Sequence, residues 1–210
     1  MIFRSLAVLV LAAGAAALVA GLALLGRAPG LSGPTRHLRL MKDRLDRPAG
    51  LRDVDMTYFA SLPHKPIMER RTELEGIGVR MEGSIQRMVL SGDGDLHLEL
   101  VEHDRVAADR DTAYVVAEIT PLWRSASPGW SFESLLATFR PNHGGRTAWP
   151  AGPARVRIAG WLNYDHPYDR PVSTWLQLHG APRRTGWEIH PVTAIEHWDE
   201  RTQSWQELPR

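Results

Sequence analysis

The 210-residue sequence contains no cysteine. This absence excludes disulfide bonds, thiolate catalysis, zinc ribbons and thiolate-held iron–sulfur clusters, and it leaves histidine and carboxylates as candidate metal ligands. The sequence also lacks a GxSxG elbow, a P-loop and a GxGxxG motif. Serine hydrolases, nucleoside triphosphatases and dinucleotide enzymes therefore find no support.

Charge of one sign is also missing, since the formal net charge is only +1. Residues 27–75 hold 10 Lys and Arg against 7 Asp and Glu, a local charge of +3, whereas residues 76–210 hold 14 against 17, a local charge of −3. Binding to nucleic-acid phosphates needs clustered Lys and Arg. Nucleic acid is therefore an unfavourable partner for the acidic part of the chain.

The first 27 residues are expected to form a transmembrane anchor. Residues 5–26 are 22 residues without a charge, and at ~1.5 Å per residue a helix of this length spans about 33 Å, roughly the hydrocarbon thickness of a bilayer. A secretory signal peptide usually has an apolar region of only ~7 to 15 residues, although cleavage remains an alternative. Ala13, Ala17 and Gly21 are spaced four apart and predict a small-residue face for another transmembrane helix. Simple alanine richness is the alternative explanation.

The side of the membrane follows less directly from the flanking charges. Six Arg and Lys residues lie between residues 27 and 47, and only Arg4 precedes the apolar run. Taken literally, this bias places the body in the cytoplasm. Large domains translocate despite such flanks, so we expect an extracytoplasmic body, with the cytoplasmic side as the alternative.

Residues 28–75 are predicted to be a linker with short helices. Residues 35–45 are consistent with an interfacial helix whose Arg and Lys side chains face lipid headgroups, or with a solvated linker. Residues 53–62 predict a second short helix that ends at Pro63, followed by extended chain up to the first strand.

Alternating apolar and polar residues beyond residue 75 predict five strands and one helix. The strands are expected at residues 76–90, 95–101, 112–120, 155–164 and 187–198, and a helix capped by Ser131 is expected before Pro141. Gly83 predicts a bend in the first strand, and Pro191 predicts an edge or a bulge in the last.

Three strands, one helix and two strands is the order of an OB fold, a small five-stranded Greek-key barrel. A DxDxH pattern at Asp93, Asp95 and His97, a strand that ends in Asp165, and an EIHPV segment from Glu188 accompany this order. Residues 76–198 thus resemble a family of uncharacterised bacterial OB-like proteins. The resemblance implies an OB-like barrel, which we expect over residues 76–210. With the predicted anchor, we expect a bacterial inner-membrane protein whose barrel is periplasmic, with the cytoplasmic side as the alternative.

Polar residues among the strand residues supply a possible metal site. Imidazole and carboxylate ligands suit zinc or manganese, and they would converge if their strands are neighbours in a closed barrel. The candidate ligands are His97, Glu99, Glu118, Asp165, Glu188 and His190. A solvated polar face or structural hydrogen bonds are the alternatives, because no HExxH pair is present. We expect no cofactor, with a divalent metal as the possible exception.

Eight tryptophans supply a possible interaction surface. Trp123, Trp130 and Trp149 flank the predicted helix, where they predict either an exposed platform for a partner or caps of the barrel core.

These features favour a single-pass membrane protein whose OB-like barrel is a binding or scaffolding module, as in an accessory subunit of a membrane complex. The lipid bilayer and other membrane proteins are the expected partners. One alternative is a nuclease-like metal-dependent hydrolase that uses His97, Asp165 and His190 with a glutamate base. The other is a single-stranded nucleic-acid binder.

Overall fold

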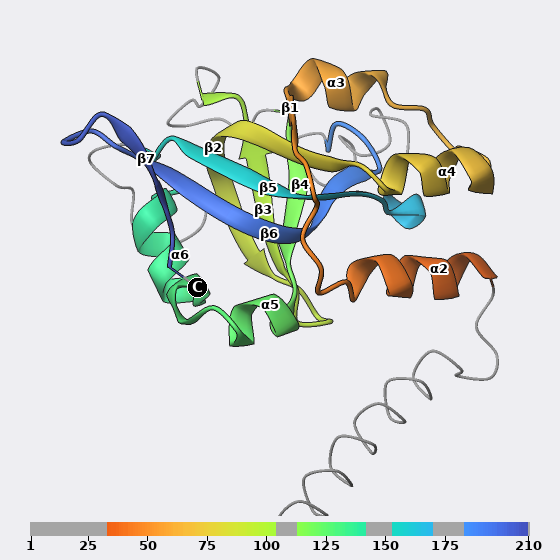
Figure 1. Cartoon of the computed structure of the whole chain (residues 1–210), viewed down its shortest axis with the longest axis horizontal. Coiled ribbons are helices and arrows are strands. Elements are labelled where there is room, and N and C mark those ends of the chain that lie inside the picture. Colours follow the sequence, from red (N-terminus) through yellow and green to blue (C-terminus); the bar gives the residue numbers. More distant parts are fainter. Residues whose placement is uncertain (1–32, 104–112, 142–152, 170–182, 210) are drawn as a thin grey trace, which may run out of the picture. The chain divides into compact units, whose positions relative to one another are not determined.

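Five strands close into a barrel in the computed structural model, which describes residues 33–103, 113–141, 153–169 and 183–209. The barrel consists of β2 (Gly78–Leu90), β3 (Leu96–Val101), β4 (Val115–Ile119), β5 (Val156–Tyr164) and β6 (Trp187–Asp199). Antiparallel pairs join β2 to β3, β3 to β4, β5 to β6 and β2 to β5, and a parallel pairing of β4 with β6 completes the circuit (Figure 1). The predicted five-stranded barrel is confirmed.

The alternation of side chains along the strands divides the core from a polar outer face. Leu96, Leu98 and Leu100 of β3 lie in the hydrophobic core with 0% exposure. Residues of the opposite parity on β3, β4 and β6 include His97, Glu118 and Glu188, which are absent from the core cluster. The same pleat that builds the core therefore places these polar side chains together outside it.

A bulge in β6 changes which residues of this strand face the core. Gly160 pairs with Val192, whereas Leu162 pairs with Ile189, so Pro191 lies in a bulge. A Cβ at Gly160 would collide with the carbonyl oxygen of Pro191, which explains why a residue without a side chain stands there. The extra residue lets both Ile189 and Val192 face the core while His190 faces outward. The predicted bulge at Pro191 is thus present.

Residues before position 76 contribute to the same core, contrary to their prediction as a linker. They form β1 (Arg52–Val54), which pairs with β2 in parallel, α3 (Met56–Ser61) and α4 (Met68–Glu75). Phe59, Leu62 and Leu74 join the core cluster. The predicted helix at 53–62 begins only after β1, because Asp55 caps α3 by accepting a hydrogen bond from the Tyr58 amide. The segment expected to be extended contains α4.

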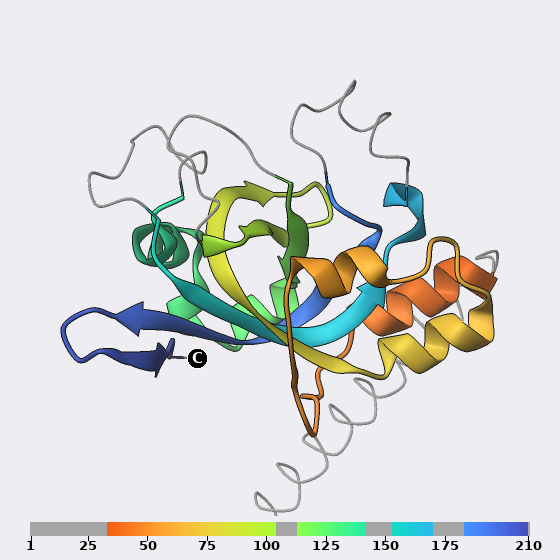
Figure 2. The same ribbon diagram turned by 90° about the horizontal axis from the view of Figure 1, so that it is seen from above.

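Helices also connect β4 to β5. These are α5 (Pro121–Ser125), the short 3₁₀ helix η2 (Pro128–Trp130) and α6 (Phe132–Phe139). Ser131 caps α6 as predicted, accepting a hydrogen bond from the Ser134 amide. A further 3₁₀ turn, η3 (His166–Tyr168), follows β5, and β7 (Ser204–Glu207) forms a hairpin with β6 that extends beyond the barrel wall (Figure 2).

The chain divides into two compact units, Met1–Leu40 and Met41–Arg210. The described part of the first unit is helical and belongs to α2 (Gly33–Lys42), which overlaps the helix predicted at 35–45. The predicted anchor at 1–27, with Ala13, Ala17 and Gly21, lies outside the described residues. Among the described residues, no helix has the length and apolar character needed to cross a membrane.

Candidate functional site

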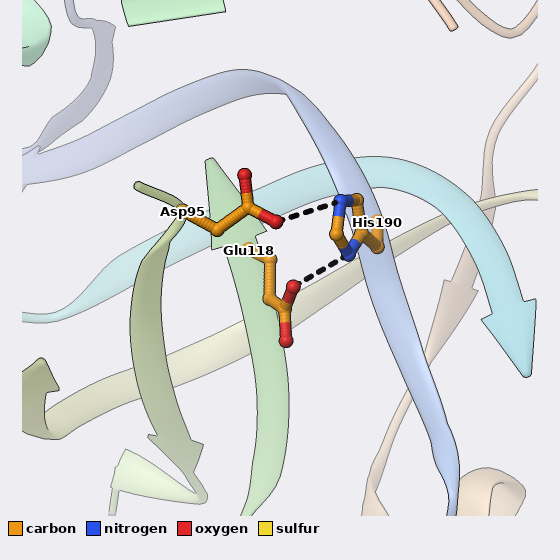
Figure 3. Close-up of side chains that lie close together, drawn as sticks. All are labelled: Asp95, Glu118 and His190. Carbon is orange, nitrogen blue, oxygen red and sulfur yellow. Dashed lines mark ion pairs between the residues drawn. The ribbon is translucent and has the colours of Figure 1, made fainter. Parts of the chain in front are cut away.

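Buried polar side chains gather on the outer face of β3, β4 and β6. His97 is the cross-strand partner of Glu118, and Asn163 of β5 is the partner of Glu188. The parallel pairing of Ala117 with Ile189 places Glu118 beside the outward residues of β6. Figure 3 shows Asp95, immediately before β3, and Glu118 directed toward His190. This set, with Asp165, is called the acidic cluster below: Asp95, Glu118, Asp165, Glu188 and His190.

His190 is the centre of the acidic cluster and has no exposed surface. Its Nδ1 donates to Glu188 Oε1 at 3.1 Å and lies 2.7 Å from Glu118 Oε2. Its Nε2 faces the Asp95 carboxylate at 3.7 Å. The two nitrogens of the ring therefore face different carboxylates.

Glu188 is held by fixed donors. Asn163 donates to Glu188 Oε1 at 2.7 Å, and Arg183 donates to Oε2 at 2.7 Å. Both Arg183 and Glu188 are buried, with Arg183 also donating to the Thr185 carbonyl. Because buried charges are retained only when paired, this ion pair fixes one side of the acidic cluster.

Lys42 approaches the other side. Its Nζ lies 3.5 Å from Glu118 Oε2 and 3.7 Å from Asp165 Oδ2. The Lys42 side chain is 19% exposed, so it reaches the acidic cluster from its solvent edge. The expectation that the Lys of residues 35–45 faces lipid headgroups is therefore not met at Lys42, because buried carboxylates attract its ammonium group.

The proton affinities of these groups reflect burial and charge. Burial raises the pKa of Asp95 to about 6, against the opposing effect of His190. Burial and then the charge of Glu188 raise the pKa of Asp165 to about 6. Burial alone would lower the pKa of His190, but Glu118 and Glu188 outweigh it and raise that pKa to about 10. The acidic cluster thus holds more negative charge than its own cations neutralise.

One buried polar atom of the acidic cluster, Nε2 of His190, has no hydrogen-bond partner among the described residues. Two triads have ligand atoms within 4.8 Å of one another: Asp95, Glu118 and His190, and Glu118, Asp165 and Glu188. Glu118 belongs to both triads, and its contacts with His190, His97 and Lys42 are ion-pair contacts by distance. An unsatisfied buried imidazole nitrogen among carboxylates is what a metal ion would satisfy.

A small pocket of about 130 Å³ adjoins the acidic cluster on the outer face of β3 and β4. Tyr114, Val116 and Tyr168 supply apolar lining, and His97 and Arg183 belong to the lining as well. His97 Nε2 contacts Glu118 Oε1 at 3.1 Å, and Arg183 contacts Glu188, so these two residues link the pocket to the acidic cluster. Pockets for drug-sized ligands measure roughly 300–1,000 Å³. The pocket is therefore sized for a small group.

The structure brings together five of the six predicted ligands. Glu118, Asp165, Glu188 and His190 are within the acidic cluster, and His97 contacts it. The exception is Glu99, whose carboxylate accepts hydrogen bonds from Gln86 and Arg87 instead.

Two further residues of the site were not among the predicted ligands. Asp95 shares the parity of His97 on a strictly alternating segment, and that alternation was a signal for its inclusion. Lys42 had no such signal, because it lies 76 residues before Glu118, the first carboxylate that it contacts.

The other predicted surfaces have different surroundings. Trp123 is 7% exposed and Trp130 is 0% exposed, and the two rings stack with centroids 6.2 Å apart, so they belong to the core. Trp149 lies outside the described residues. The arginines of the barrel strands pair with carboxylates: Arg80 with Asp53, Arg87 with Glu99, and Arg155 and Arg157 with Glu82.

Comparisons with known proteins assign no family to the chain: no protein-family model matches it, and neither does any curated protein.

Proposed function

We propose that this chain is a membrane-tethered binding module, built on an OB-like barrel, that holds a divalent cation in its acidic cluster. The observation that carries the cation proposal is the buried triad of Asp95, Glu118 and His190, in which the fully buried His190 Nε2 has no hydrogen-bond partner among the described residues. An accessory role in a larger membrane complex is the cellular context that we infer for it.

The OB-like assignment is supported by topology. The strand circuit β2-β3-β4-β6-β5 returns to β2, and the helices α5 and α6 lie between the third and fourth strands of the barrel. A five-stranded Greek-key barrel of this kind commonly binds ligands on the face of its second and third strands. Here these strands are β3 and β4, which carry His97 and Glu118 and line the pocket.

The membrane tether is supported by the sequence alone. Residues 5–26 have the length and the absence of charge that a transmembrane helix requires. A small-residue face at Ala13, Ala17 and Gly21 supports association with another membrane protein. The expected location, with the barrel in the periplasm, rests on the same residues.

The chemistry of the triad fits a metal ion. Metal-bound histidines usually donate one ring N–H to a carboxylate or carbonyl, which directs the other nitrogen to the metal. His190 has this arrangement, because its Nδ1 donates to Glu188 and its Nε2 is directed toward Asp95. A cation at Nε2 would take Glu118 from its present 2.7 Å contact with Nδ1. One imidazole with carboxylates suits manganese or zinc. The cation would neutralise the carboxylates that burial disfavours.

Burial favours binding over catalysis at this position. Catalytic metal sites keep one coordination position open to water or substrate, whereas Glu118, Glu188 and His190 are 0% exposed. One observation favours the hydrolase alternative: His97 both lines the pocket and contacts Glu118, so a small substrate there would meet an imidazole next to the cation. Nucleic-acid binding is less favoured, since the strand arginines are paired with carboxylates.

Mn²⁺ titration of the chelator-treated full chain in detergent tests the cation site, with the electron paramagnetic resonance signal of free Mn²⁺ as the readout. We expect one Mn²⁺ per chain and at least a tenfold loss of affinity in Glu118→Gln, because Glu118 belongs to both triads. The exposed Glu133 of α6 provides the matched control Glu133→Gln, which should bind as the wild type does. Absence of binding, or equal binding by Glu118→Gln, would overturn the proposal.

A further inference from the structure

We propose that Lys42 fills the second position of a two-cation site, so that the chain takes one divalent ion where the carboxylates alone would take two. This inference rests on the cation site proposed above and adds a regulatory residue to it. The two triads of the acidic cluster share Glu118, in the manner of a carboxylate that bridges two positions. Two-metal sites in proteins hold ions about 3.5–4 Å apart around such shared ligands.

The position of the Lys42 ammonium group matches the second triad. Its Nζ lies 3.5 Å from Glu118 Oε2 and 3.7 Å from Asp165 Oδ2, and both residues belong to the triad of Glu118, Asp165 and Glu188. In the other triad, the Asp95 carboxylate approaches His190 at Nε2. Lys42 is thus placed where a second ion would bind, while the first triad retains its unpartnered Nε2.

The charges of the acidic cluster agree with one divalent ion. Its four carboxylates face two fixed cations, Lys42 and Arg183, when His190 serves as a neutral ligand. One divalent ion then neutralises the remaining two negative charges. Deleting the Lys42 ammonium group leaves one uncompensated buried negative charge and an open position beside Glu118 and Asp165, and burial makes such a charge unfavourable.

The acidic cluster holds Lys42 less tightly than it holds Arg183. The Arg183 side chain is 3% exposed and is fixed by Glu188 and the Thr185 carbonyl. The Lys42 side chain is 19% exposed and contacts carboxylates at distances longer than strong hydrogen bonds. Lysine also carries a compact ammonium group on a flexible stem, whereas the guanidinium of arginine is a planar fork with fixed hydrogen-bond geometry. Lys42 is therefore the more exposed and the less tightly held of the two cations.

The test compares Mn²⁺ stoichiometry in the wild type and in Lys42→Ala, using the full chain in detergent after chelator treatment. We expect one Mn²⁺ per chain in the wild type and two in Lys42→Ala, with a spin-coupled Mn²⁺ pair in the paramagnetic resonance spectrum of the variant. Lys42→Arg keeps the charge and should bind one. Arg70→Ala, which removes an exposed cation from α4, should also bind one.

Asp165→Asn in the Lys42→Ala background should return the stoichiometry to one, because Asp165 belongs only to the second triad. Circular dichroism reports folding of each variant, and Lys42→Met supplies a second uncharged side chain if the alanine variant does not fold. One ion in the wild type and one in the uncharged variants would overturn the role of Lys42 and leave the cation site intact. Two ions in the wild type would also overturn it. No ion in the wild type or in any variant would instead refute the cation site itself.

Discussion

The Asp95→Asn variant should lose less stability than the wild type as the pH rises, because burial disfavours the ionised Asp95 carboxylate. Asp95 is 6% exposed, and burial raises its pKa from 3.8 to about 6. The folded state therefore holds a proton that the unfolded state has released between these two values. As the pH rises through this window, Asp95 costs the folded state stability that is not recovered at higher pH.

The expected size follows from the shift of about two pKa units, each worth about 1.4 kcal/mol. Between pH 4 and pH 7, the free energy of unfolding of Asp95→Asn minus that of the wild type should rise by about 2 kcal/mol. Urea denaturation with tryptophan fluorescence at each pH, in the presence of a chelator, measures this difference. A difference that stays constant or falls with pH would refute the argument from burial.

Asp93, two residues earlier, supplies a control of opposite sign. Burial would raise its pKa, but hydrogen bonds from the Ser91 hydroxyl and the Asp95 amide outweigh burial and lower it. The ionised form of Asp93 therefore stabilises the folded state, and this stability is lost as the pH falls below 3.8. Asp93→Asn should lose stability relative to the wild type as the pH rises to about 4, and the difference should stay nearly constant from pH 4 to pH 7.

The remaining predictions concern packing and paired charges. Arg183→Met leaves the Glu188 carboxylate buried without its cation and should cost about 3–5 kcal/mol of unfolding free energy. The double variant Arg183→Met with Glu188→Gln should restore most of this loss. Equal stability of the single and double variants would contradict the pairing. Phe59→Ala should cost about 3–5 kcal/mol because Phe59 is 0% exposed in the barrel core, whereas Leu51→Ala, at a 43% exposed residue, should cost little. Gly160→Ala should cost about 1–3 kcal/mol, since its Cβ meets the Pro191 carbonyl; urea denaturation checks both, and a neutral Gly160→Ala would show that the bulge is not constrained there.

The barrel strands were predictable because each has one buried face. Leu96, Leu98 and Leu100 alternate with polar residues, and such a period of two specifies a half-buried strand without knowledge of its neighbours. The helix α6 was equally accessible from the Ser131 cap and its apolar spacing. Local patterns therefore gave the order of the strands and the helix.

The structure of the segment before residue 76 could not be predicted from such local patterns. Phe59 and Leu74 lie in short helices whose apolar residues are too few to show a period, and their burial depends on a sheet formed later in the chain. For α4 the sequence MERRTELE is strongly polar, although Leu74 packs in the core. The secondary structure of such segments depends on tertiary packing rather than on the local sequence.

The candidate site was predictable in part for a similar reason. Four of the predicted ligands lie on the outer face of paired strands, so closure of the barrel brings them together: His97, Glu118, Glu188 and His190. Glu99 lies on the same face of β3 as His97 but further along the strand, where its carboxylate accepts hydrogen bonds from Gln86 and Arg87. Lys42 reaches the acidic cluster from outside the sheet, and no strand pattern contains that contact.

Diffraction from crystals soaked in Mn²⁺, recorded at a wavelength where manganese scatters anomalously, would locate the cation itself. We expect an anomalous peak among the side chains of Asp95, Glu118 and His190, about 2.0–2.3 Å from their ligand atoms, with Lys42 still beside Asp165. Peaks confined to exposed carboxylates, with none in the acidic cluster, would show that these residues do not form a cation site.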